Sequence, residues 1–151
     1  MAIKYYWEDF APGRVIETAT RTLSEDDILR FAREWDPQTY HTDVEAARSS
    51  PYGGLIASGW HTGAVAMRLM CDSYLLETSC VGSPGLDELR WLKPVRPGDT
   101  LRLRSTVIEA MPSSKQPKRG TVLFRWEILN QNKEVVLSMR GRQLFLRRTP
   151  A

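Results

Sequence analysis

The sequence predicts an α+β fold in which one antiparallel sheet curls around a central helix. Residues 14–22 alternate between apolar and polar side chains as a strand does, and residues 60–79 form a long apolar segment at helical spacing. After residue 85 the chain consists of alternating stretches separated by turns, which is typical of antiparallel strands. With 151 residues the chain can bury a sizeable core, so we expect one domain over residues 1–151.

A first helix over residues 25–35, "EDDILRFAREW", has a clear start and a clear end. Ser24 is suited to the N-cap, and Asp27, three residues later, completes the pattern of a capping box. Asp36-Pro37 predicts the end of the helix, because the residue before a proline is disfavoured in helical backbone.

The middle of the chain predicts a short helix, a loop and a long helix. "DVEAARSS" (43–50) is a short polar helix, and "PYGGLIASG" (51–59) is too rich in glycine to be anything but a loop. The segment "WHTGAVAMRLMCDSYLLETS" (60–79) is apolar on nearly all sides, so we expect a helix buried on most of its surface.

The C-terminal part predicts the main sheet. Four strand-like stretches are separated by the turns "RPGD" and "NQNKE" and by the basic loop "MPSSKQPKRG": "LDELRWLKPV" (86–95), "TLRLRSTVIEA" (100–110), "TVLFRWEIL" (121–129) and "VVLSMRGRQLFLRR" (135–148).

The charge is uneven along the chain. Residues 1–89 hold seven Lys/Arg and fourteen Asp/Glu, whereas residues 90–151 hold fourteen and four. The basic part predicts either a solvated sheet face or the attraction of a phosphorylated ligand, but not nucleic acid, because no reader motif accompanies the charge. The candidates for holding ligand phosphates are Lys93, Arg96, Lys115, Lys118 and Arg119.

Neither a membrane nor an oxidising compartment is indicated. The N-terminus has no apolar signal region, and the uncharged stretch 49–67 is interrupted by a proline and several glycines. Two cysteines, Cys71 and Cys80, cannot form a disulfide framework and fit no zinc motif. We therefore expect a cytoplasmic protein with no metal.

The stretch "EWDPQTYHTD" (34–43) contains a candidate acid/base pair, Asp36 and His41. A histidine titrates near neutral pH, and a nearby carboxylate can orient it or share the transfer of protons. Five residues across a turn that contains proline let both side chains point into one pocket. The alternative is structural, with Asp36 forming the Asp-Pro turn and His41 capping the short helix.

Two further candidates lie at the start of the long helix. Gly59 precedes it, and backbone N–H groups at a helix N-terminus can stabilise a negatively charged oxygen. The alternative for Gly59 is close packing. His61 is either an ordinary buried histidine or, with His41 and acidic residues, a ligand of a metal ion, although the spacing of these residues fits no known metal motif.

Residues 31–70, "FAREWDPQTYHTDVEAARSSPYGGLIASGWHTGAVAMRLM", resemble the hydratase motif of the MaoC-like acyl dehydratases, of the (R)-specific enoyl-CoA hydratase type. Asp36 and His41 keep the spacing of the family motif, Asp43 and Ala46 fall in their expected places, and "RPGDTL" (96–101) is also typical. The resemblance implies the hot-dog fold, in which an antiparallel sheet wraps a long central helix.

The resemblance also implies an activity, the interconversion of a trans-2-enoyl thioester and a (R)-3-hydroxyacyl thioester. The substrate would be carried on coenzyme A or acyl carrier protein, with no cofactor, and the protein would be a homodimer. The implied site consists of three catalytic residues, Asp36, His41 and Gly59, and four substrate-binding residues, Gln38, Tyr40, Trp60 and His61.

Three departures from the family pattern leave alternatives open. Trp35 and Thr39 replace a glycine and a proline of the motif, and Met67 stands where some of these hydratases place a serine that positions the aspartate. A subunit that binds acyl thioesters without catalysis is therefore one alternative. A hot-dog thioesterase, which needs no such Asp/His pair, is another.

Overall fold

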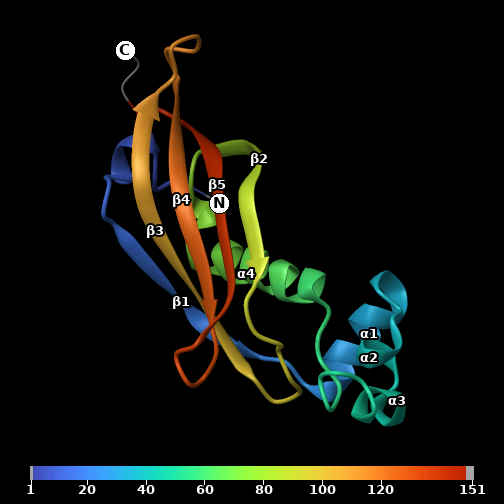
Figure 1. Ribbon diagram of the computed structural model, residues 1–151. Helices are drawn as coiled ribbons and strands as arrows, with labels where there is room; N and C mark the ends of the chain where they lie inside the picture. The colour runs from blue at the N-terminus through green and yellow to red at the C-terminus, as the bar shows by residue number, and fades with distance from the viewer. Residues whose placement is uncertain (1, 149–151) are drawn as a thin grey trace.

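The structure of the protein is a computed structural model, and it describes residues 2–148 (Figure 1). A single antiparallel sheet runs in the order β1-β3-β4-β5-β2. Its strands are β1 (Val15–Thr22), β2 (Cys80–Trp91), β3 (Thr100–Pro112), β4 (Arg119–Leu129) and β5 (Val135–Leu146). Strands β1 and β2 therefore form the two edges of the sheet.

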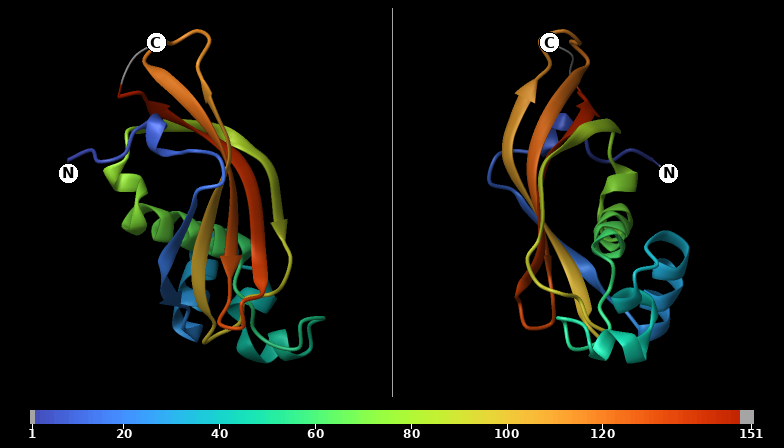
Figure 2. Two further views of the ribbon diagram at one scale, coloured as in Figure 1. Left: turned by 90° about the vertical axis from the view of Figure 1, so that its left-hand side faces the viewer. Right: turned by 45° about the vertical axis from the view of Figure 1, so that its right-hand side comes forward.

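Helix α4 (Gly59–Ser73) lies across the concave face of the curved sheet (Figures 1 and 2). Three further helices gather beyond the N-terminal end of α4: α1 (Glu25–Trp35), α2 (Thr39–Thr42) and α3 (Val44–Arg48). Two 3₁₀ turns, η1 (Trp7–Asp9) and η2 (Leu75–Glu77), complete the fold. The predicted hot-dog fold, a sheet wrapped around a central helix, is confirmed.

The core fills the space between α4 and the sheet. Phe10, Phe124 and Phe145 are fully buried; the rings of Phe10 and Phe145 stack with centroids 4.6 Å apart, and Phe10 meets Phe124 edge to face at 5.8 Å. Val65 and Leu69 of α4 belong to the same cluster. This packing fixes α4 over the sheet and so determines where its N-terminus lies.

The local signals around α1 are confirmed. The Ser24 side chain accepts a hydrogen bond from the Asp27 N–H at 3.0 Å, and the Asp27 carboxylate accepts one from the Ser24 N–H at 3.0 Å. The helix ends at its C-cap Asp36, immediately before Pro37. The chain also forms α2, a short helix over Thr39–Thr42 that the sequence did not predict.

The long central helix is shorter than predicted. It ends at Ser73 rather than near residue 79, because Tyr74 leaves the helical region with φ −152° and ψ −31°. The Tyr74 hydroxyl lies 2.9 Å from the Ser105 Oγ of β3, and burial raises the pKa of Tyr74 to about 12. This buried contact ties the end of α4 to the sheet.

The expectation that α4 is buried on most of its surface is wrong for one face. Trp60 is 61% exposed and Met67 is 49% exposed, and both lie on the side next to the edge strand β2.

Strand β2 also begins earlier than predicted, at Cys80, and its pairing with β5 is irregular at three places. No helix within residues 2–148 has the length and apolarity needed to cross a membrane.

Replacing Ser24 by alanine should lower the free energy of unfolding by about 1 kcal/mol, because the first turn of α1 loses its side-chain cap. Urea denaturation measures the change. The matched control is Ser49→Ala, since Ser49 is exposed at the C-cap of α3, where backbone hydrogen bonds close the helix end. Equal stability losses in the two variants would contradict a capping role for Ser24.

Candidate active site

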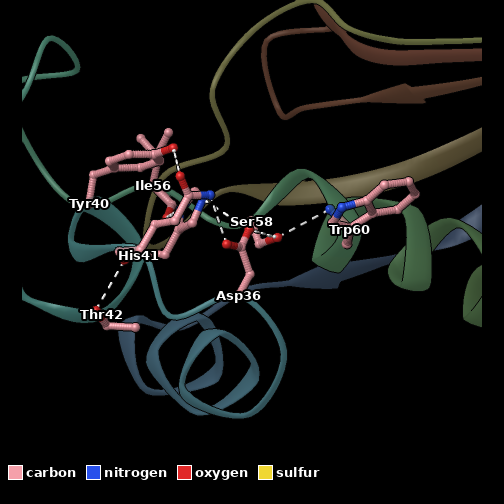
Figure 3. Close-up of polar contacts among 8 residues, drawn as sticks. Asp36, Tyr40, His41, Thr42, Ile56, Ser58 and Trp60 are labelled. Carbon is pink, nitrogen blue, oxygen red and sulfur yellow. Dashed lines mark hydrogen bonds and ion pairs between the residues drawn. The ribbon is translucent and has the colours of Figure 1, made fainter.

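Asp36 and His41 meet at the junction between α1 and α2. Asp36 is the C-cap of α1, and His41 lies in the single turn of α2 that follows. The His41 Nε2 atom is 3.4 Å from the Asp36 Oδ2 atom, and both side chains are mostly buried (Figure 3). The turn that contains proline therefore brings the two predicted residues together.

Two side chains hold the Asp36 carboxylate in place. The Ser58 hydroxyl donates to Oδ2 at 2.7 Å, and the Gln38 amide donates to Oδ1 at 2.8 Å. Burial alone would raise the pKa of Asp36, but the hydrogen bonds from Ser58 and Gln38, together with the nearby His41, outweigh it and lower the pKa. Asp36 is thus an oriented carboxylate at neutral pH.

The backbone of the glycine-rich loop sets the tautomer of His41. The His41 Nδ1 atom lies 2.7 Å from the carbonyl oxygen of Ile56. A carbonyl oxygen only accepts hydrogen bonds, so Nδ1 carries the proton and, in the neutral ring, Nε2 has a free lone pair. Nε2 and the Asp36 carboxylate are then two acceptors that face each other.

The pair opens into a cavity of about 490 Å³ next to the N-terminus of α4. The cavity is lined by residues of the α1–α2 junction, of α2, of the loop before α4, of α4, and of the end of β2 and the segment after it: Asp36, Gln38, Tyr40, His41, Tyr52, Ile56, Ala57, Gly59, Trp60, Thr62, Trp91, Leu92, Lys93, Pro94 and Val95. At the helix end, the Ser58 Oγ accepts the Trp60 N–H at 3.3 Å. The positive end of the helix dipole faces the same cavity at Gly59.

Gly59 is also needed for packing. A Cβ atom at this position would lie 2.4 Å from the Cε2 and Nε1 atoms of Trp91, so no side chain fits beneath the indole. Trp91 in turn meets the Trp60 ring edge to face, with centroids 5.1 Å apart. The packing interpretation of Gly59 is confirmed, and Gly59 also lines the cavity.

Three of the four predicted substrate-binding residues line this cavity: Gln38, Tyr40 and Trp60. The Tyr40 hydroxyl donates to the Gln38 amide oxygen at 2.6 Å, which orients the amide group that Gln38 directs at Asp36. Tyr40 also contacts the His41 ring edge to face at 4.4 Å. A chain of contacts therefore runs from Tyr40 through Gln38 to the carboxylate.

The structure does not bring His61 to the pair. His61 lines a separate recess between α1 and α4, where its ring stacks on Phe31 with centroids 4.4 Å apart. Two residues after Gly59 the helix turns this side chain to the opposite side of α4. Within residues 2–148 its buried Nδ1 atom has no hydrogen-bond partner.

Sequence reasoning missed Ser58 and the carbonyl group of Ile56. The resemblance suggested a serine on the central helix with Met67 in its place, but the serine that contacts Asp36 is the N-cap of α4. A serine immediately before a helix start is a recognisable N-cap signal. The carbonyl of Ile56 could not be predicted from the sequence, because every residue has a backbone carbonyl group.

The predicted basic residues separate into two groups. Lys93 lines the cavity, and Arg96 donates to the Tyr52 carbonyl at 2.7 Å at its rim. Lys115 and Lys118 belong to the β3–β4 hairpin, which lies at the far end of the sheet from α1–α3 (Figure 1), and Arg119 begins β4 there. Among the described residues, no group of three or more His, Cys, Asp or Glu side chains is arranged to hold a metal ion.

Comparison with known proteins agrees with this geometry. The family described as "MaoC like domain" matches residues 9–125. The chain belongs to the MaoC-like domain family. A crystal structure of the MaoC-like dehydratase from Rhodospirillum rubrum superposes with a TM-score of 0.87 and 40% identity, covering 97% of this MaoC-like chain and 99% of that one.

Two curated relatives add to the comparison. The uncharacterized protein YdeM of Bacillus subtilis is 36% identical over 113 residues, which cover 75% of this chain and 77% of that protein. Mesaconyl-CoA hydratase of Cereibacter sphaeroides is 46% identical over 63 residues, but the match covers 42% of this chain and only 18% of the hydratase. Family membership supports a hydro-lyase role for this MaoC-like protein.

The buried His61 predicts a pH dependence of stability. Burial lowers the pKa of His61, Asp27 partly opposes this effect, and Arg21 and Arg30 add to it, so the unfolded chain takes up the proton first as pH falls. The contribution of the neutral His61 ring to the free energy of unfolding is then fully present above the pKa of His61 in the unfolded chain, about 6.5. This contribution is lost as the pH falls towards the lower pKa of His61 in the folded protein. We expect the melting temperature of the native protein to fall more steeply between pH 7.5 and 5.5 than that of His61→Phe, which keeps the ring stacking. Parallel curves would contradict this origin.

Proposed function

We propose that this MaoC-like protein hydrates trans-2-enoyl thioesters to (R)-3-hydroxyacyl thioesters, or catalyses the reverse dehydration. One observation carries the proposal: Asp36 Oδ2 and His41 Nε2, which are both acceptors when the His41 ring is neutral, face each other at 3.4 Å beside an open cavity. This distance exceeds a normal hydrogen bond, and two such acceptors are matched by one water molecule that donates a hydrogen to each. A water held in this way is oriented for attack.

The pair would then add the elements of water to one face of the double bond. The water oxygen bonds to the β-carbon of the enoyl group while one of its protons passes to the pair, and the pair delivers a proton to the α-carbon. Asp36 and His41 together bind and release one proton in each cycle, so no cofactor is consumed. The contacts with Ser58, Gln38 and Ile56 support this role because they fix both groups before the substrate arrives.

The Gly59 N–H is our candidate for stabilising the thioester oxygen. As the proton is transferred, negative charge develops on this oxygen, and the N-terminus of α4 offers a backbone donor and the positive end of the helix dipole. A donor of this kind contributes a rate factor of roughly 10²–10³. The place of Gly59 in the lining of the cavity supports this role.

The departures from the family motif at Trp35, Thr39 and Met67 leave the contacts of Asp36 and His41 in place. This argues against a subunit that binds acyl thioesters without catalysis. Trp35 is exposed and lines the recess of His61 rather than the cavity. Thr39 opens α2 without disturbing His41, and Gln38 still donates to Asp36. Ser58 supplies the contact that Met67 cannot make. A thioesterase would need only one acidic group, so the paired acceptors favour hydration.

The carrier of the acyl group, coenzyme A or acyl carrier protein, ends in a phosphopantetheine whose phosphates need a basic partner. Arg96 at the rim of the cavity and Lys93 at its wall, whose ammonium group also pairs with Glu134, are the candidates that support this part of the proposal. The hairpin residues Lys115 and Lys118 are too far along the sheet to serve the same cavity within one chain.

The central test uses Asp36→Asn, His41→Ala and the double variant. If both groups act on one water, each single change should lower the turnover of an enoyl-CoA by at least about 10²-fold, followed by loss of the conjugated-thioester absorbance. The double variant should lose far less than the product of the two, because residues that act as a unit are not additive.

Asp26→Asn is the matched control, because Asp26 is an exposed carboxylate at the other end of α1. Its turnover should equal that of the native protein. Melting temperatures of all variants separate a chemical effect from unfolding. Full activity of Asp36→Asn would eliminate the mechanism.

We also propose a homodimer joined along the edge strand β2. Val81, Leu86 and Trp91 of β2 are exposed apolar side chains. Leu86 and Trp91 line one recess together with Trp60 and Met67 of α4, so an apolar face lies at this edge of the sheet. Light scattering should give twice the chain mass of 17.3 kDa, and Leu86→Lys should shift the mass towards that of one chain. A native protein that is monomeric at micromolar concentration would refute the dimer.

A further inference from the structure

His61, Arg21 and Trp35 line a recess between α1 and α4 that the proposed reaction does not use. The recess has a volume of about 230 Å³, and its walls are the end of β1, α1 and the first turn of α4. It shares no lining residue with the catalytic cavity or with the apolar recess at the β2 edge. The recess is therefore separate from both the cavity and the proposed dimer contact.

The His61 ring presents one nitrogen to this recess. The residue is 8% exposed, its ring stacks on Phe31, and its Nδ1 atom is buried without a hydrogen-bond partner among the described residues. Nε2 also has no partner there but stays accessible, and because His61 lines the recess, Nε2 faces it. A buried N–H group without an acceptor is rarer than a buried acceptor without a donor, so the neutral ring carries its proton on Nε2. The recess thus contains a hydrogen-bond donor that no group within residues 2–148 uses.

The charged side chains of the recess leave one cation unpaired. Arg30 forms an ion pair with Asp27 at 3.0 Å, so these two charges neutralise each other. The Arg21 side chain forms no ion pair or hydrogen bond with the described residues, although it is close enough to act electrostatically on both Asp27 and His61. Glu34 is exposed, so water and salt screen its charge. Arg21 and the His61 Nε2–H are therefore two free donors, which match the two oxygens of a carboxylate.

The remaining wall of the recess is apolar. Leu23 is buried and Phe31 is half-buried, whereas Trp35 is 68% exposed. Trp35 is one of the departures from the family motif, and the catalytic pair does not use it. The recess is smaller than the roughly 300–1,000 Å³ of pockets for drug-sized molecules, so its ligand must be small. The exposed indole offers a flat apolar surface to the body of such a ligand.

We propose that the recess between α1 and α4 binds a small organic carboxylate with a flat apolar body. One carboxylate oxygen accepts the His61 Nε2–H and the other accepts the Arg21 guanidinium, while the body lies against the Trp35 indole. The site does not depend on the proposed hydratase function, because it uses no residue of the catalytic cavity.

Benzoate is the probe, because it is a flat carboxylate without other polar groups. In calorimetric titrations the native protein should bind benzoate at least about tenfold more tightly than benzamide, which has the same shape without the charge, since a hydrogen bond to a charged group contributes roughly that factor or more. Benzylamine, with the opposite charge, should bind more weakly still. Acetate, which has the carboxylate without the ring, should bind more weakly than benzoate because it buries less apolar surface.

Two substitutions remove one donor each. His61→Phe keeps a ring stacked on Phe31, Arg21→Gln keeps a side chain of similar length, and each should weaken benzoate binding by at least about tenfold. Glu34→Gln should change the affinity in the opposite direction, because it removes a negative charge beside the ligand. The matched control is Arg33→Gln, which changes an exposed arginine of α1 that does not line the recess, and it should bind benzoate like the native protein.

Trp35 gives a readout that is local to the recess. Nuclear magnetic resonance of isotope-labelled protein should show a benzoate-dependent shift of the Trp35 indole N–H signal, assigned with Trp35→Phe. The signals of Trp60 and Trp91, beside the catalytic cavity, should not shift comparably. In Trp35→Ala the affinity for benzoate should fall towards that for acetate. This substitution at an exposed position and Arg21→Gln decide the matter if His61→Phe does not fold.

Several outcomes contradict the site. Equal affinities for benzoate and benzylamine, or no binding at millimolar benzoate, overturn it. So does a shift of the Trp60 and Trp91 signals alone, or unchanged affinity in both donor variants. Turnover of enoyl-CoAs is measured separately: a protein that binds benzoate in the recess but hydrates no enoyl-CoA keeps the site and overturns the hydratase. A protein that hydrates enoyl-CoAs but binds no benzoate keeps the hydratase and overturns the site.

Discussion

The Asp36 carboxylate accepts a hydrogen bond from Ser58, and this contact joins the end of α1 to the beginning of α4. The two residues are each boundary residues of a helix, one the C-cap and the other the N-cap. Core packing fixes α4 over the sheet. Because Ser58 at the start of α4 binds Asp36, the position of α4 also determines where α1 ends and α2 begins. The orientation of the carboxylate, of His41 beside it and of the cavity in front of them all depend on this junction.

The fold was largely predictable because its signals are local and repeated. Alternation of apolar residues gives the strands, the Ser24–Asp27 capping box begins α1, and Asp36-Pro37 ends it. The length of α4 was overestimated because Tyr74 stops the helix by bonding Ser105, a partner 31 residues away that no local pattern reveals. The exposed face of α4 was missed because an apolar helical pattern does not show which of the apolar faces is covered by the core.

The site was predictable to the extent that it depends on residue type. Asp36, His41 and Gly59 stand in a recognisable order, and the structure places them around one cavity. What decides their chemistry is less visible in the sequence, because the tautomer of His41 is set by the backbone carbonyl of Ile56. His61 shows the opposite error, since a histidine next to the site in sequence lies on the other side of the helix.

The contact between Gly59 and Trp91 constrains how this protein can change. A methyl group at position 59 is excluded as long as the indole covers it, whereas a smaller residue at position 91 would remove the obstacle. Substitutions at the two positions are therefore ordered: position 91 must shrink before position 59 can grow. Sequence drift that began at Gly59 would meet a steric barrier, and drift that began at Trp91 would first reshape the wall of the cavity. The wall of the cavity is thus free to diverge early, while the helix terminus beneath it stays fixed.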